Sequence, residues 1–141
     1  MMYQKILVPV DTSRASMAAL KEACELCQRL NSNLHILHVS NMIAHPLDKE
    51  NHEQDSPLSI AKNTVESYGI PYTTEIQQNT GEKVANIILR SVKENQADLV
   101  IMGTHGFSGM MHLLMGSIAE GVLRQAEVPV MLLRRGRPQE S

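Results

Sequence analysis

The sequence predicts an α/β fold, in which one doubly wound sheet of parallel strands carries helices on both faces. Short apolar runs rich in β-branched residues alternate with longer segments whose apolar residues recur at helical spacing. The first run, residues 5–10, is apolar almost throughout, which is typical of a parallel strand covered on both sides. The segments between runs are long enough for the helical crossovers that parallel pairing requires. We therefore expect five strands to alternate with four helices.

Composition limits the classes of function that need consideration. The 141 residues predict a single domain, 1–141, and 43% hydrophobic with 20% charged residues is ordinary for a globular protein. A formal net charge of −2 provides no basic field for nucleic acid or an anionic membrane. The longest apolar stretch, 128–133, is too short to span a bilayer, and the run 6–10 is too short for a secretory signal. We expect a cytoplasmic protein that binds neither nucleic acid nor a membrane.

The amino-terminal part predicts a strand, a helix and a second strand. The first strand is expected over 5–10 and should be ending at Pro9, because proline cannot donate to a ladder. A helix is expected over 13–30, followed by a strand over 34–39. Three capable N-cap residues precede the helix: Asp11, Thr12 and Ser13.

Cys24 and Cys27 form a C-x2-C pair inside this first helical pattern. A zinc site would need a second ligand pair, and a thioredoxin-like site would place the pair at the start of a helix. Both cysteines instead continue the apolar stripe of the helix. We expect them to be reduced and to face the core.

The middle of the chain is less regular. Residues 40–57 are polar and aperiodic, and we expect a surface excursion there. A second helix is expected over 58–68, with Gly69 as its cap. Residues 72–76 (YTTEI) alternate between polar and apolar side chains, which predicts a less buried edge strand.

The carboxyl-terminal part repeats the alternation. A third helix is expected to start at Thr80-Gly81-Glu82 and to close at 95–97, with a strand over 98–102. A fourth helix over 116–125 and a fifth strand over 128–133 follow. The apolar stripe of the third helix consists of Val84, Ile87, Ile88, Ser91 and Val92.

The stretch 98–124 concentrates the chain's glycines. Five of the eight glycines lie there, between an apolar strand and the start of a helical pattern. A helix start offers unpaired N–H groups and partial positive charge, and glycine lets the backbone approach an anion closely. This arrangement predicts a phosphate site, although one or two of the glycines would be explained equally well as turn residues.

The spacing Gly103-x2-Gly106-x9-Gly116-Ser117 resembles the nucleotide-binding signature of the universal stress protein family, in its ATP-binding branch. The blocks KILVPVDTS, ADLVIMGTHG and LLMGSIAEGVLRQAEVPVMLL continue the resemblance at both ends of the chain. The resemblance implies a Rossmann-like sheet of order 3-2-1-4-5, similar to that of the adenine nucleotide alpha-hydrolases. It also implies a homodimer in which the fifth strand, 128–133, pairs antiparallel with its copy.

The same resemblance implies where an adenine nucleotide would lie. The main chain near Pro9, Val10 and Val39 would hold the adenosine, together with the Asp11 carboxylate, for which an N-cap role alone remains an alternative. The glycines and Ser117 would hold the phosphates, with Met102 and Val130 as apolar wall. The residues expected at the site are Pro9, Val10, Asp11, Thr12, Val39, Met102, Gly103, His105, Gly106, Gly116, Ser117, Ile118 and Val130.

The loop departs from the family pattern at Phe107 and His112, where many members carry basic residues. A triphosphate is strongly anionic and backbone donors neutralise little of its charge, so we expect Mg²⁺ or Mn²⁺ to accompany the nucleotide. We expect that nucleotide to be ATP, with ADP and AMP as alternatives. The loop contains no Lys or Arg between Gly103 and Ser117, and the motif G-x4-G-K-[ST] is absent.

These features favour an ATP-binding regulatory protein with little or no turnover; slow hydrolysis or autophosphorylation stays open. A nucleotide-free interaction module of the same family is the main alternative. A synthetase that cleaves adenine nucleotides would need a serine- and glycine-rich loop after the first strand, where the chain reads VDTSRAS. An NAD-type domain would need G-x-G-x-x-G at that place. The stretch contains no glycine, so the sequence argues against both of these enzyme classes.

Overall fold

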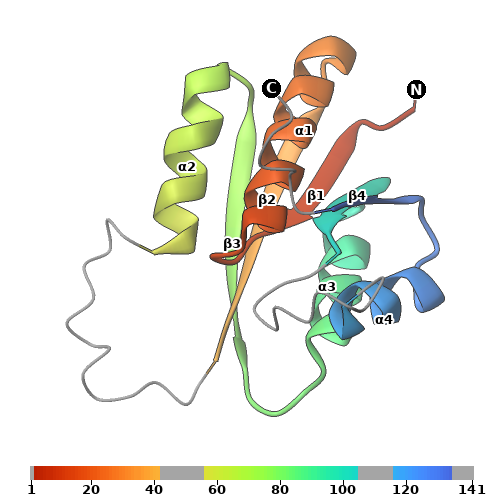
Figure 1. The fold of residues 1–141 in the computed structure, drawn as a ribbon. Helices are drawn as coiled ribbons and strands as arrows, with labels where there is room; N and C mark the ends of the chain where they lie inside the picture. The colour runs from red at the N-terminus through yellow and green to blue at the C-terminus, as the bar shows by residue number, and fades with distance from the viewer. Residues whose placement is uncertain (1, 42–55, 105–115, 135–141) are drawn as a thin grey trace.

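The computed structural model describes residues 2–41, 56–104 and 116–134 (Figure 1). Strands and helices alternate through these residues, and all the strands form one parallel sheet of order β3-β2-β1-β4-β5. The predicted α/β fold and strand order are confirmed. The elements are β1 (Lys5–Pro9), α1 (Arg14–Leu30), β2 (Asn33–Asn41), α2 (Pro57–Tyr68), β3 (Tyr72–Asn79), α3 (Val84–Asn95), β4 (Leu99–Gly103), α4 (Ser117–Gln125) and β5 (Val130–Leu133).

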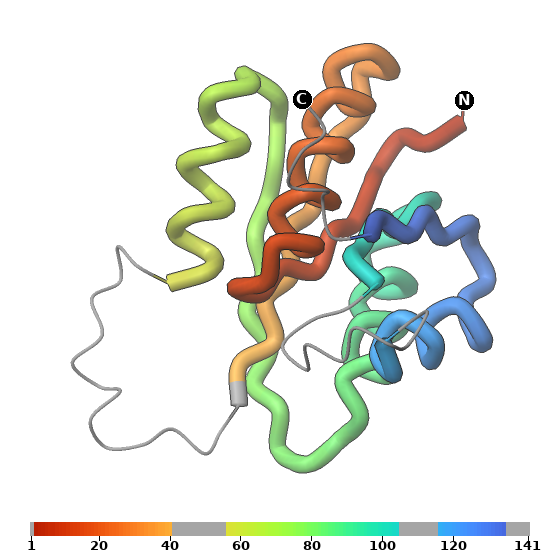
Figure 2. Tube along the Cα trace, in the orientation of Figure 1, coloured from red at the N-terminus to blue at the C-terminus, as the bar shows by residue number. Residues whose placement is uncertain are grey.

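Helices cover both faces of the sheet, α1 and α2 on one and α3 and α4 on the other (Figures 1 and 2). Successive residues of the central strands enter opposite cores. On β1, Ile6 and Val8 pack beneath α1 and α2, whereas Leu7 packs beneath α3 and α4. Ile101 and Met102 of β4 divide in the same way. Burial on both faces explains why these strands lack a polar side.

The first two helices begin and end at residues whose chemistry favours those positions. Ser13 is the N-cap of α1, and its hydroxyl accepts the Ser16 N–H at 3.1 Å. Pro57 occupies the first turn of α2, where a missing N–H costs nothing. Gly69 caps α2 with a φ of 69°, a left-handed conformation that glycine adopts without strain. Both helices lie within one residue of their predicted positions.

The predicted start of the third helix is wrong. Gly81 has a φ of 122°, which no helical residue adopts, and its N–H donates to the Asn79 side chain at 2.9 Å. The resulting turn delays α3 to Val84, with Lys83 at the N-cap and no side-chain cap bond. Ala85 is then buried, and Val84 only half-buried.

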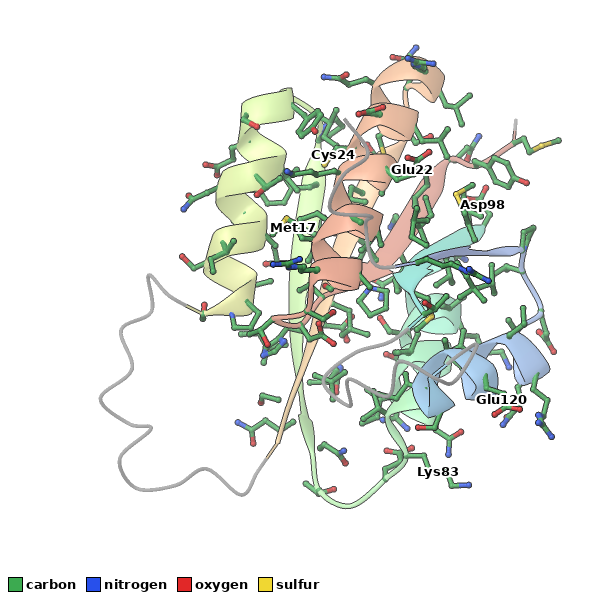
Figure 3. The ribbon with its side chains drawn as sticks, viewed as in Figure 1. Met17, Glu22, Cys24, Lys83, Asp98 and Glu120 are labelled. Atoms are coloured by element: carbon green, nitrogen blue, oxygen red, sulfur yellow. The ribbon has the colours of Figure 1, made fainter. Side chains whose placement is uncertain are left out.

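Strand ends differ from prediction by one to three residues. The edge position of β3 is confirmed, but β3 continues past Ile76 to Asn79, because β2 also continues to Asn41 and pairs with it throughout. The fifth strand begins at Val130 instead of 128, after Pro129. Asp98 directly precedes β4 (Figure 3), and its carboxylate accepts the N–H groups of Gln4 and Lys5 at 2.9 and 3.0 Å. That carboxylate ties the start of β1 to the start of β4.

Cys24 and Cys27 of α1 are free thiols buried in the core between the sheet and the α1–α2 layer, as predicted. Figure 3 labels Cys24 on α1. Burial raises the pKa of Cys24 to about 11 and that of Cys27 to about 12, with smaller contributions from Glu25 and from Cys24 respectively. Neither thiol is therefore in its reactive thiolate form near neutral pH.

Of the helices that the structure describes, none has the length and apolar character needed to cross a membrane.

Candidate functional site

The carboxyl ends of β1 and β4 lie side by side, at the point where the winding of the sheet reverses. The chain leaves β1 for β2 on one side through α1, and it reaches β5 from β4 on the other side through α4. The β1–β4 register pairs Ile6 with Leu99 and Leu7 with Val100. The same register, continued, aligns Val10 with Gly103. In doubly wound sheets such an edge is where ligands bind.

Asp11 organises the turn from β1 into α1. Its Oδ1 accepts the Ser13 N–H at 2.7 Å, and its own N–H donates to Ser16 Oγ at 2.9 Å. The N-cap of α1 is therefore Ser13, so the alternative that Asp11 merely caps this helix is wrong. Asp11 is half-buried, whereas Thr12 is exposed. An ionised carboxylate has further acceptor positions, so Asp11 can bind a hydroxyl or amino donor without giving up its turn.

The pairing between β1 and β2 also ends at this edge. Their register ends with the pair Pro9 and Leu37, beyond which the Val10 N–H donates to the Leu37 carbonyl at 2.8 Å. The Val10 carbonyl is instead 3.1 Å from Nδ1 of His38. Sequence reasoning missed His38, because a single histidine in a strand gives no signal of what it contacts across the sheet. Val39, the next residue, is half-buried.

Gly103, at the end of β4, packs against the first turn of α1. A Cβ added to Gly103 would lie 2.6 Å from Cβ of Ala15 and 2.7 Å from its carbonyl carbon. A packing requirement therefore explains this glycine, whether or not it also approaches a ligand. The expected apolar wall lies deeper: Met102 is buried in the core beneath α3 and α4, and Val130 packs against that core.

The start of α4 lies at this edge as well. The Gly116 N–H donates to the Thr104 carbonyl at 2.5 Å, and the Thr104 N–H donates to Leu133 at 2.9 Å. Gly116 is the N-cap, followed by the exposed Ser117 and Ile118. Their N–H groups belong to the first helical turn, which has no carbonyl within the helix to bond. His105 and Gly106 lie outside the described residues.

A polar cluster away from this edge was also missed from the sequence. Nε2 of His35, on β2, is 2.8 Å from Glu75 Oε1 on β3, and Ser91 Oγ on α3 donates to the same oxygen at 2.6 Å. Nδ1 of His35 contacts Thr73 Oγ1 at 2.7 Å. Burial raises the pKa of Glu75, but hydrogen bonds from Ser91, His35 and Gln77 outweigh it and lower the pKa to about 2. The hydrogen bond from Ser91 to Glu75 thus connects α3 to the edge strand β3.

No group of three or more His, Cys, Asp or Glu side chains in 2–41, 56–104 or 116–134 could hold a metal ion.

Comparison with known proteins relates the chain to one family. The model of the universal stress protein family matches residues 2–134. Universal stress protein MJ0531 of Methanocaldococcus jannaschii is 28% identical over 145 residues, covering 95% of this chain and 84% of that protein.

Solved structures agree with this relationship. Protein MJ0577 of the same organism superposes with a TM-score of 0.80 at 23% identity, over 97% of this chain and 99% of that one. A universal stress protein family member from Burkholderia pseudomallei gives a TM-score of 0.73 at 29% identity, over 94% and 96%.

Three further structures of universal stress proteins contain a nucleotide. AMP is bound in the protein from Arabidopsis thaliana, dAMP in one from Archaeoglobus fulgidus, and cAMP in a third. Their TM-scores are 0.68, 0.70 and 0.73 at 21%, 20% and 21% identity, over 97%, 94% and 96% of this chain and 97%, 99% and 100% of theirs. At this identity they share the fold.

Proposed function

The chain belongs to the universal stress protein family, and from that premise we propose that it binds an adenine nucleotide at the carboxyl edge of β1, β2 and β4. Nucleotide occupancy then alters the oligomeric state of the protein or its choice of partner, with little or no turnover. The relatives that hold AMP, dAMP or cAMP support the class of ligand. ATP is the form we propose for this chain, on the glycine spacing from Gly103 to Ser117.

The observation that carries the proposal is that Asp11 and the α4 N-terminus both lie at the edge where the winding reverses, after β1 and β4 respectively. A ribose or an adenine amino group offers donors that the Asp11 carboxylate accepts. Phosphates suit the opposite end, where the first-turn N–H groups of Ser117 and Ile118 and the helix dipole favour an anion. The edge is thus complementary in polarity to a nucleotide, with an acceptor for the adenosine at one end and donors for the phosphates at the other.

The acidic phosphates need more positive charge than these amides supply. We propose that Mg²⁺ or Mn²⁺ enters with a triphosphate and is held mainly by its oxygens, since the described residues contain no protein cage for it. AMP carries less charge and should depend less on the cation. The absence of Lys and Arg from 103–117 supports slow chemistry, because phosphoryl transfer relies on such groups to stabilise the transition state.

The two free edges of the sheet differ, and this difference supports a homodimer through β5. β5 carries the sequence VMLL, with Met131 exposed at 36%, and a bare apolar edge invites pairing. β3 is polar at most positions, which discourages strand addition. Antiparallel pairing of β5 with its copy would cover the apolar edge.

One observation favours the nucleotide-free alternative, in which the domain serves only to bind other proteins. Gly103 and Gly121 are explained by close packing, against Ala15 and Ala85 respectively, and the Gly116 N–H is already bonded to Thr104. Part of the glycine pattern therefore has a structural reason that needs no ligand.

Native mass spectrometry of the freshly purified chain, followed by calorimetry with AMP, ADP and ATP with and without Mg²⁺, separates the two functions. Recovery of an adenine nucleotide, or saturable binding of any of the three, is the expected result. A ligand-free protein that binds none of them would leave the interaction module as the better explanation.

A further inference from the structure

The pairing of β1 with β2 ends one rung before it could, after Pro9 and Leu37. The rung after Pro9–Leu37 would pair Val10 with His38 and would use the Val10 carbonyl as acceptor for the Val39 N–H. The side chain of His38 takes the place of the Val39 N–H in that bond, because its Nδ1 lies 3.1 Å from the Val10 carbonyl oxygen. A carbonyl oxygen only accepts, so Nδ1 carries the hydrogen and donates.

Because the His38 side chain bonds the Val10 carbonyl, the main-chain N–H and C=O of Val39 face the side of β1 without a bond to it. In a parallel ladder, alternate residues of a strand turn their N–H and C=O toward the same neighbour. The Leu37 carbonyl bonds to β1 through Val10, so Val39, two residues later, also faces β1. On the other side of β2 the pairing with β3 continues without a break to Asn41 and Asn79. Val39 thus presents one donor and one acceptor to the space past the end of β1.

We propose that His38 is a positioning residue, which holds the Val10 carbonyl and thereby presents the main-chain N–H and C=O of Val39 to the Watson–Crick edge of adenine. The assignment rests on the proposed nucleotide site and explains how that site selects its base. Adenine offers an amino donor beside a ring-nitrogen acceptor, and a single extended residue matches this pair. Hypoxanthine offers the reverse pattern in the same two positions, so IMP is the matched competitor.

Three substitutions separate this role from simple packing. In His38→Asn the amide nitrogen is the same number of bonds from Cβ as Nδ1, so it keeps the donor. In His38→Gln the amide nitrogen corresponds to Nε2, so the donor is displaced although a polar side chain remains. His38→Ala removes the donor altogether.

Calorimetry with AMP and with IMP on the full chain tests base selection. AMP should bind His38→Ala and His38→Gln about tenfold more weakly than the unaltered chain, and His38→Asn within about threefold of it. IMP affinity should change by less than about twofold in all three, so the preference for AMP falls only where the donor is lost. An unchanged AMP-to-IMP ratio in His38→Ala, or equal losses in Asn and Gln variants, would overturn the assignment.

Amide hydrogen exchange without any ligand tests the geometry separately. In His38→Ala the Val10 carbonyl is released and the Val39 N–H can complete the rung, so its exchange should slow relative to the unaltered chain and to His38→Asn. Unchanged Val39 exchange in His38→Ala would contradict the positioning role even if nucleotide binds. If exchange follows the expected order and the unaltered chain binds no adenine nucleotide, the proposed function and the assigned adenine contact are both wrong, whereas the strand geometry stands.

Discussion

Gly103 and Ala15 approach so closely that the two positions cannot both carry an unmoved side chain: a Cβ on Gly103 would lie 2.6 Å from that of Ala15 and 2.7 Å from its carbonyl carbon. The contact joins the end of β4 to the first turn of α1, the two elements that border the proposed site. Because two of the three nearest atoms, the carbonyl carbon and oxygen of Ala15, belong to the backbone, side-chain rotation cannot relieve the contact.

Gly103→Ala should therefore lower the free energy of unfolding by about 1–3 kcal/mol, the usual range for overpacking. Adding Ala15→Gly should recover only part of the loss, because the backbone contact at 2.7 Å remains. The matched pair is Gly121→Ala with Ala85→Gly, where the conflict is between Cβ atoms alone at 2.8 Å, so the second change should relieve it. Urea denaturation of the four variants measures this, and full rescue by Ala15→Gly would contradict the backbone clash.

Gly116→Val should abolish nucleotide binding and leave the fold intact. Gly116 has a φ of −72°, which valine adopts freely, so the backbone need not change. The added side chain would stand beside the first-turn amides that the phosphates are proposed to contact. Calorimetry with ATP and Mg²⁺ measures affinity and circular dichroism checks the fold, with Leu123→Val on exposed α4 surface as the control. Unchanged affinity would mean that the segment before α4 serves only as a connection.

Glu75→Gln should make stability less sensitive to acid. The pKa of Glu75 is lowered from 4.5 to about 2 in the folded chain, so the unfolded chain binds the proton more tightly. The stabilisation is fully present above about pH 4.5 and is lost as the pH falls toward 2. Urea midpoints between pH 7 and 2.5 should decline more steeply for the unaltered chain than for the variant. Parallel curves would show that Glu75 is not linked to folding. Glu82→Gln is the comparison, because the Arg90 hydrogen bond also lowers the pKa of Glu82 but at a more exposed site.

Cys24 and Cys27 should resist thiol reagents while the chain is folded. Burial raises the pKa of the two thiols to about 11 and 12, so the thiolate that attacks such a reagent is scarce at pH 8. Both should react rapidly in guanidinium. Spectrophotometric titration with a disulfide reagent, with and without denaturant, tests this, and fast reaction of the native chain would indicate that α1 opens readily from the core.

Met131→Lys should dissociate the proposed dimer into monomers, since a charge on β5 would have to be buried against its copy. Ile76→Lys on β3 is the matched control, because Ile76 is more exposed, at 57%, and lies on the opposite edge. Analytical ultracentrifugation measures both. Dimers that survive Met131→Lys and dissociate with Ile76→Lys would assign the interface to the other edge.

The elements of the fold could be predicted from sequence because each depends on local signals. Apolar runs mark the strands, and Ser13 and Gly69 mark helix boundaries through their own side chain or lack of one. The start of α3 could not be predicted in this way. Its delay depends on a φ of 122° at Gly81, which a sequence pattern of Thr-Gly-Glu does not reveal.

The residues of the site differ in the same way: those with a local sequence signal could be predicted, and those defined by contacts between elements could not. Asp11 stood out because it directly follows a buried strand. The contact of His38 with Val10 spans two strands, and the cluster of His35, Glu75 and Ser91 spans three elements, so neither has a local signature. The same holds for Gly103, whose neighbour Ala15 is 88 positions earlier in the chain.

Thr104 and Gly116 fix the two ends of the segment between β4 and α4, through a bond to each other and a further bond from Thr104 to β5. These bonds join main-chain atoms, so they connect the end of β4 to the start of α4 without using any side chain. Side chains at this edge can therefore change while the start of α4 keeps its attachment to the sheet.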